Sequence, residues 1–272
     1  MNDVVLYSGG IDSFLVHHYL NKKNIEHSLL YFNLQGKYSK NEMDLFNSGK
    51  FKKTIKHEVI ISNCLNMGVL EHEDAFIPNR NILAAIMANS VTGFDNIWIG
   101  GTNSDRVNDN NQQLFKSLSD LMTSINPGKT IKIDSPFWGY HKADIAKDFV
   151  NTYGWKQYDT IDDAKRALIN CTFSCYYPLQ QARDLDVDYQ FGIEPHFTAE
   201  CMNCGACFRK CITLNACGIF VSMSKDAIEL VDHYYEEARN YIIHNDDNDY
   251  MLPRMIATLA YVEKWKRYEG IA

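Results

Sequence analysis

Residues 4–20, "VVLYSGGIDSFLVHHYL", join an apolar run typical of a buried strand to a helical pattern through a loop of small residues. The loop is Ser8-Gly9-Gly10, and the helical pattern opens with Asp12 and Ser13. Glycines at a strand-to-helix turn let backbone N–H groups point into one concavity, and the start of the helix adds partial positive charge. The stretch therefore predicts an anion-binding loop, with phosphate as the preferred anion.

Three side chains of this loop extend the prediction. Ser8 and Ser13 carry hydroxyl groups that can donate hydrogen bonds to phosphate oxygens. The Asp12 carboxylate would repel a phosphate unless a divalent cation bridged the two, as Mg²⁺ commonly does. Asp12 has a simpler alternative role as a helix cap beside a glycine turn. The complete string favours the phosphate loop over the cap.

Beyond this loop, strand-like and helical patterns alternate along the first half of the chain. Predicted strands cover residues 3–8, 27–33, 57–62, 96–101 and 132–137, and predicted helices cover 12–23, a polar stretch ending near 56, 79–91 and 141–154. This alternation predicts an α/β fold with a parallel sheet covered by helices on both faces. Ligands of such sheets bind beyond the carboxyl ends of the strands. The loops at 33–35 and 100–103 would lie there beside Ser8-Gly9-Gly10.

Composition and charge limit the class of protein. The net charge of −7 and the pI near 5.7 argue against a nucleic-acid binder that neutralises many phosphates. Residues 50–56, "KFKKTIK", form a local basic run, for which a solvated helix face is the favoured interpretation. Apolar runs are far shorter than the roughly 20 residues of a membrane-spanning helix. The chain starts without an export segment, so we expect a cytoplasmic protein.

Seven of the eight cysteines crowd into residues 171–217, and clustered cysteines in a chain without an export signal more often bind metal than form disulfides. The Cys-x2-Cys-x2-Cys motif at 201–207 predicts thiolate ligands of Zn²⁺. Cys211 extends the motif to the spacing of bacterial ferredoxins, with Ile212 where a proline usually follows, so an iron–sulfur cluster is the alternative. We expect Cys171 and Cys217 to be buried or surface thiols and Cys64 to pack in the core.

The string "SGGIDS" after an N-terminal strand resembles the SGGxDS loop of the PP-loop ATP pyrophosphatases. It is neither a Walker loop nor a dinucleotide fingerprint. The resemblance implies an adenine-nucleotide alpha-hydrolase-like fold and cleavage of ATP between its α and β phosphates. It also implies that Ser8, Gly9, Gly10, Asp12 and Ser13 contact the nucleotide.

Further stretches resemble one branch of that superfamily, the 7-cyano-7-deazaguanine synthase or QueC family, and they run in order over residues 4–210. The stretches are "LQGKYSKNEM", "IPNRNILAAIMA", "IGGTNSD", "IDSPFWGYHKADI", "TFSCYYP" and "CMNCGACFRK". The residues that match the family's motifs are Gln35, Glu42, Arg80, Asn81, Asn103, Asp105 or Asp109, Pro136 and Lys142.

The resemblance implies a role for each matched residue. Asp12, Ser13 and Lys142 would be catalytic, Arg80 and Asn81 would bind the nucleotide, Gln35, Asn103 and Asp105 would bind the substrate, and Cys175, Cys201, Cys204 and Cys207 would hold Zn²⁺. A guanidinium fork at Arg80 suits a carboxylate or phosphate. Lys142 could neutralise charge on the leaving pyrophosphate. For both side chains the alternative is a surface position at the start of a helix.

The implied activity is that of an ATP-dependent carbon–nitrogen ligase, with ATP, Mg²⁺ and Zn²⁺ as cofactors and a homodimer as the assembly. It would convert 7-carboxy-7-deazaguanine and ammonia to 7-cyano-7-deazaguanine through an adenylated carboxylate and an adenylated amide. No protein nucleophile is required. The implied organisation is a PP-loop domain at 1–160, a cysteine-rich zinc region at 161–221 and a helical extension at 222–272.

One departure from the family pattern keeps several activities open. After "GTNSD" the family continues with a Ser-Gly-Tyr-Pro-Asp-Cys-Arg type of stretch, whereas this chain has "RVNDNNQQLFKSL". The enzyme could therefore stop at the amide or use another carboxylate. The sequence is also compatible with a tRNA-modifying PP-loop enzyme with an iron–sulfur cluster, a ligase of the asparagine- or argininosuccinate-synthetase sort, and a non-catalytic ATP-binding module. Intact Asp12 and Ser13 weigh against the last.

Overall fold

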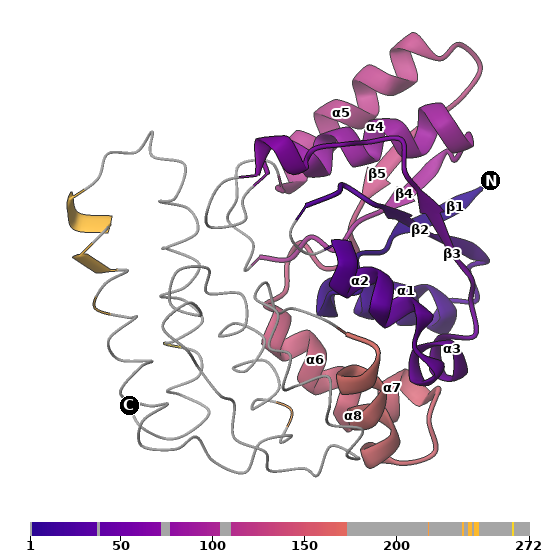
Figure 1. Cartoon of the computed structure of the whole chain (residues 1–272), viewed down its shortest axis with the longest axis vertical. Helices are drawn as coiled ribbons and strands as arrows, with labels where there is room; N and C mark the ends of the chain where they lie inside the picture. The colour runs from indigo at the N-terminus through magenta and orange to yellow at the C-terminus, as the bar shows by residue number, and fades with distance from the viewer. Residues whose placement is uncertain are drawn as a thin grey trace.

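The computed structural model describes residues 2–36, 39–71, 77–103 and 110–172, together with residues 217, 236, 239–240, 242–244 and 263. These residues contain a five-stranded sheet with the strand order β3-β2-β1-β4-β5. Every neighbouring pair of strands is parallel. Helices cover both faces of the sheet (Figure 1), so the predicted α/β fold is confirmed.

The strands are β1 (Asp3–Leu6), β2 (His27–Phe32), β3 (Val59–Ser62), β4 (Asn96–Trp98) and β5 (Lys132–Asp134). The helices are α1 (Ile11–Lys22), α2 (Ser39–Asn47), α3 (Gly49–Ile55), the 3₁₀ helix η1 (Gly68–Leu70), α4 (Arg80–Thr92), α5 (Gln112–Ile125), α6 (Lys142–Asn151), α7 (Tyr153–Lys156) and α8 (Ile161–Asn170). In the described ranges, none of the helices combines the length and the apolar character that a membrane span requires.

Two apolar cores lie on opposite faces of the sheet. Side chains alternate between the faces along each strand, so Val5 joins one core and its neighbour Val4 joins the other. The core of Val5 also contains apolar residues of α1, α3, α6 and α8, whereas the core of Val4 contains residues of α4 and α5. Figure 1 shows α4 and α5 on one side of the sheet and α1 on the other. Burial on both faces explains the nearly continuous apolar runs of β1 and β2.

Several helices differ from the predicted ones. The polar stretch ending near residue 56 forms two helices, because Ser48 ends α2 and its side chain caps α3 by accepting a hydrogen bond from the Phe51 N–H at 3.2 Å. The helix predicted over 141–154 ends at Asn151, and Gly154 lies in the kinked α7 with φ 55°. Helices α5 and α8 were not predicted. Phe51 is buried while Lys52 and Lys53 are exposed, which confirms the solvated helix face.

Three cysteines lie in the described part of the chain. The predicted core position of Cys64 is wrong, because Cys64 is exposed and its sulfur accepts a hydrogen bond from Ser62 Oγ at 3.0 Å. It follows β3, which is one of the two edge strands of the described sheet, so the chain stays at the surface there. Cys171 and Cys217 are buried, and burial raises the pKa of each thiol to about 12. Both behave as protonated core residues.

Candidate functional site

The loops that follow β1 and β4 meet at the carboxyl edge of the sheet. Strands β1 and β4 are neighbours, and the chain continues from them to opposite sides, β1 toward β2 and β4 toward β5. Such a switch point is where ligands of open α/β sheets bind. The contact is close, since a Cβ atom on Gly100 would lie only 2.6 Å from Asp12 Cβ.

The loop after β1 has the backbone geometry of an anion site. Gly9 has φ 74°, and a Cβ atom there would come within 2.7 Å of a methyl group of Leu45 in α2. Gly10 is the N-cap of α1 and provides no side-chain cap, whereas the side chains of Ser48, Asn111, His141 and Thr160 cap α3, α5, α6 and α8. Ser13 Oγ donates a hydrogen bond to the Gly10 carbonyl at 3.0 Å. The start of α1 can therefore accept an anion from outside the helix.

Two of the residues predicted to be catalytic form an ion pair at this loop. Lys142 Nζ lies 2.6 Å from Asp12 Oδ2, and the side chains are 12% and 22% exposed. Lys142 is the first residue of α6, and α6 packs against α1 in the core. The fold thus brings together two residues that are 130 positions apart, and it gives Lys142 a partly buried partner instead of the surface position that was its alternative.

A second polar group joins the end of β2 to α2. Tyr31 OH donates a hydrogen bond to Glu42 Oε2 at 2.5 Å. Burial raises the pKa of the Glu42 carboxyl to about 7, and the negative charge of Glu71 adds to the increase, while the Tyr31 hydrogen bond and the positive charge of Arg80 act against it. Arg80 opens α4, whose N-cap Asn79 has φ 58° and makes no side-chain cap. The start of α4 therefore lacks a side-chain cap, as the start of α1 does.

Three more of the predicted site residues lie in the described part of the chain, after β2, after β4 and at the start of α4. Gln35 has φ 57° and its N–H donates to Asn33 Oδ1 at 3.1 Å, directly after β2. Asn103 is exposed beyond β4, where its N–H donates to the Tyr140 carbonyl at 2.9 Å. Asn81 is the second residue of α4. Asp105, Cys175, Cys201, Cys204, Cys207 and Cys211 lie outside the described residues.

The Tyr31–Glu42 hydrogen bond was not predicted, although Glu42 had been matched in "LQGKYSKNEM". It depends on burial and on the way α2 folds back over β2, and neither is visible as a motif. The raised pKa makes Glu42 a carboxyl that changes charge near neutral pH.

We expect Glu42→Gln to reduce the loss of stability that occurs as pH rises from 4.5 to 8. The folded protein holds the Glu42 proton up to about pH 7, against an ordinary pKa of 4.5, so the folded state binds more protons between these values and stability falls as pH rises through them. Glutamine stays neutral, so relative to the unsubstituted protein the variant should gain about 2–3 kcal/mol between pH 4.5 and pH 8. Urea unfolding at both pH values measures this gain. Glu58→Gln, at an exposed position, should show none.

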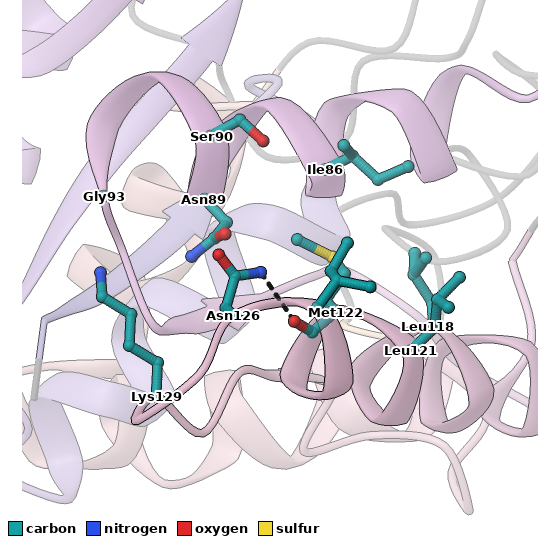
Figure 2. Close-up of a pocket in the computed structure, with 10 residues that line it drawn as sticks. Ile86, Asn89, Ser90, Gly93, Leu118, Leu121, Met122, Asn126 and Lys129 are labelled. Atoms are coloured by element: carbon teal, nitrogen blue, oxygen red, sulfur yellow. Dashed lines mark hydrogen bonds between the residues drawn. The ribbon is translucent and has the colours of Figure 1, made fainter.

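A cavity of about 450 Å³ lies elsewhere, between α4 and α5. Figure 2 shows apolar side chains of both helices facing it, with Asn126 bonded to the Met122 carbonyl at 2.7 Å. None of the predicted site residues lines this cavity. It is therefore separate from the polar residues at the carboxyl edge of the sheet.

Comparison with known proteins extends these observations. A family model described as "Queuosine biosynthesis protein QueC" matches residues 2–218. No curated protein matches the chain. The matched range contains both polar groups at the sheet edge and the cysteine motif at 201–207.

Proposed function

Because the chain belongs to the QueC family of queuosine biosynthesis proteins, we propose that it is an ATP-dependent ligase that makes 7-cyano-7-deazaguanine from 7-carboxy-7-deazaguanine and ammonia. The observation that carries the proposal is the Asp12–Lys142 ion pair at the start of α1, beside a glycine loop without a side-chain cap. The Asp12 carboxylate offers negative charge for a metal ion, and Lys142 offers positive charge for the pyrophosphate leaving group itself.

The nucleotide's β and γ phosphates would lie against Ser8-Gly9-Gly10 and the first turn of α1. Backbone N–H groups and the Ser8 hydroxyl group would donate hydrogen bonds to the phosphate oxygens, and the Ser13 hydroxyl group would do so once it releases the Gly10 carbonyl. The Asp12 carboxylate and the serine oxygens are hard oxygen donors, which suit Mg²⁺. When bound there, Mg²⁺ would neutralise phosphate charge. Lys142, already held at this position, would stabilise the charge that develops on the leaving pyrophosphate.

The chemistry needs no protein nucleophile. The substrate carboxylate attacks the α-phosphorus of ATP and releases pyrophosphate, and ammonia then displaces AMP to give the amide. The amide oxygen attacks a second ATP, and loss of AMP and a proton leaves the nitrile. The residues of this chain would act by holding the reacting groups in line and by stabilising charge.

Residues after β2, β3 and β4 would hold the deazapurine and the nucleotide. The Arg80 guanidinium suits a carboxylate or a phosphate, and Gln35 and Asn103 offer side-chain amides. We propose that Asp105 joins them. Four thiolates at Cys175, Cys201, Cys204 and Cys207 match the ligand set of a closed structural Zn²⁺ site.

The stretch that departs from the family pattern favours a second candidate. Residues 112–118 of "RVNDNNQQLFKSL" begin α5, and Phe115 and Leu118 are buried in the core. These positions therefore support packing and do not recognise a base. A ligase that stops at the amide, or that takes another carboxylate, is consistent with the absence of the family's base-recognition stretch at these positions.

The test is incubation with ATP, Mg²⁺, ammonium and 7-carboxy-7-deazaguanine, followed by mass spectrometry. We expect the nitrile to accumulate together with AMP and pyrophosphate, because each adenylation converts a poor leaving group into AMP. Amide as the final product would identify the second candidate. AMP release without consumption of this base would reject the substrate, and absence of AMP would reject the ligase. Reactions without ammonium serve as the control.

A further inference from the structure

Three histidines meet at the amino edge of the sheet, the edge opposite the loops described above. His17 lies in α1, His27 is the first residue of β2, and His57 lies between α3 and β3. One ring nitrogen of each lies within 4.8 Å of the others. Pairing of Leu29 with Val59 in the parallel ladder places His27 beside His57, and their rings stack with centroids 5.2 Å apart.

The hydrogen bonds of two of these rings show which ring nitrogen of each carries a lone pair. His27 Nδ1 lies 2.8 Å from the Ile25 carbonyl and His57 Nδ1 lies 3.2 Å from the Ile55 carbonyl. A carbonyl only accepts, so each Nδ1 carries the proton and each Nε2 is an acceptor. A backbone carbonyl that fixes the tautomer in this way is typical of metal-binding histidines.

His17 completes the group from the helix. Its Nδ1 lies 2.8 Å from His27 Nε2, and its Nε2 lies 3.2 Å from Asn21 Nδ2. Asn21 Nδ2 also donates to Gln157 Oε1 at 3.3 Å, so the Asn21 amide presents N–H groups, His17 Nε2 accepts, and His17 Nδ1 donates to His27 Nε2. Metal binding would require the other tautomer of His17, with the proton on Nε2 and the Asn21 amide turned to accept it, and the Nδ1 lone pair would then face the other two rings.

Burial keeps two of the three rings away from solvent, since His17 is fully buried and His27 is 7% exposed. Neutral imidazole is the form that binds a metal ion. His57 is more exposed than either and provides a route from solvent. Asp3 pairs with His27 across the β1–β2 ladder, and its carboxylate offers negative charge nearby.

We propose that His17, His27 and His57 form a site for a late first-row divalent cation, with Zn²⁺ as the natural occupant, separate from the cysteine cluster. Three imidazoles suit zinc and disfavour Mg²⁺ and Ca²⁺, which take oxygen ligands. Zn–N bonds of about 2.0–2.1 Å in a tetrahedron place nitrogens roughly 3.3 Å apart, so the His17 and His27 nitrogens, now 2.8 Å apart, would separate and nitrogens up to 4.8 Å apart would move closer. Water would fill the fourth position. The ion would tie α1, β2 and the start of β3 together.

Metal titration of the full chain tests this site. The cysteine cluster is expected to bind its own zinc, so the comparison is between the unsubstituted protein and His57→Gln after removal of metal with a chelator. We expect His57→Gln to bind one zinc equivalent fewer. With Co²⁺ it should lose the part of the ligand-field absorption that the imidazole site contributes while keeping the thiolate-to-cobalt charge-transfer band, because only cysteine sulfur produces that band.

His27→Gln is the second variant, and it should lose the same equivalent. His18→Gln is the matched control, because His18 is a buried neighbour in α1 that bonds Gln157 at 2.9 Å and does not join the group. Far-ultraviolet circular dichroism checks that each variant is folded. Equal zinc in the unsubstituted protein and both variants would overturn the proposal, and so would an equal loss in His18→Gln.

Discussion

Asp12→Asn is expected to lower ATP-dependent AMP release by about 100- to 1000-fold, which is the usual cost of removing one group that stabilises transition-state charge. Asparagine keeps the shape of the side chain and removes its charge. Lys142 then loses the carboxylate that lies 2.6 Å from its Nζ, and the loop loses the anionic oxygen donor that we propose for Mg²⁺. Both effects act on the pyrophosphate end of the nucleotide.

Release of AMP and pyrophosphate under saturating ATP measures the effect. Asp162→Asn is the matched control, because Asp162 is exposed and, like Asp12, lies in the first turn of a helix. We expect it to retain normal activity. AMP release by Asp12→Asn within a few fold of the unsubstituted protein would contradict the role of the ion pair. If Asp12→Asn and Asp162→Asn both released AMP at the normal rate, the fold would be intact and the loop after β1 would not be the site that we propose.

Most of the sheet could be predicted because its strands are apolar on both faces. Runs such as "DVVL" and "HSLLYF" stand out from the polar helices around them. Helix α5 was missed for the opposite reason. It opens in a run of asparagine and glutamine, and its buried residues are Phe115, Leu118 and Met122. A parallel β4–β5 pair still requires a crossover connection of that length.

The residues of the candidate site could be predicted from the sequence, but the contacts between them could not. Motif resemblance could identify Asp12 and Lys142 separately, but their contact follows from the packing of α6 beside α1, which no local pattern encodes. The three histidines of the amino edge carry no motif either. Their sequence separations match neither helix nor strand periodicity, and only the strand register brings His27 and His57 together. The pKa of Glu42 likewise depends on burial.

The glycine after β4 gives the second large effect. We expect Gly100→Ala to lower the free energy of unfolding by about 1–3 kcal/mol, since a Cβ atom there would lie 2.6 Å from Asp12 Cβ and 3.1 Å from the Ser13 nitrogen. These atoms belong to the first turn of α1, so relief of the clash must move the loop after β4 or the start of α1. A displacement near one ångström at a reacting centre can cost about 100-fold in rate, and we expect AMP release to fall by that amount.

Gly139→Ala separates this effect from the general effect of adding a methyl group. A Cβ atom on Gly139 would meet no atom within 4 Å, so that variant should match the unsubstituted protein in both measurements. Chemical denaturation gives the stability and AMP release gives the rate. A normal rate in a destabilised Gly100→Ala protein would mean that the clash is relieved away from α1. The contact between the two loops would then support the fold without positioning Asp12, and the proposal that the switch point holds the nucleotide would lose its geometric basis.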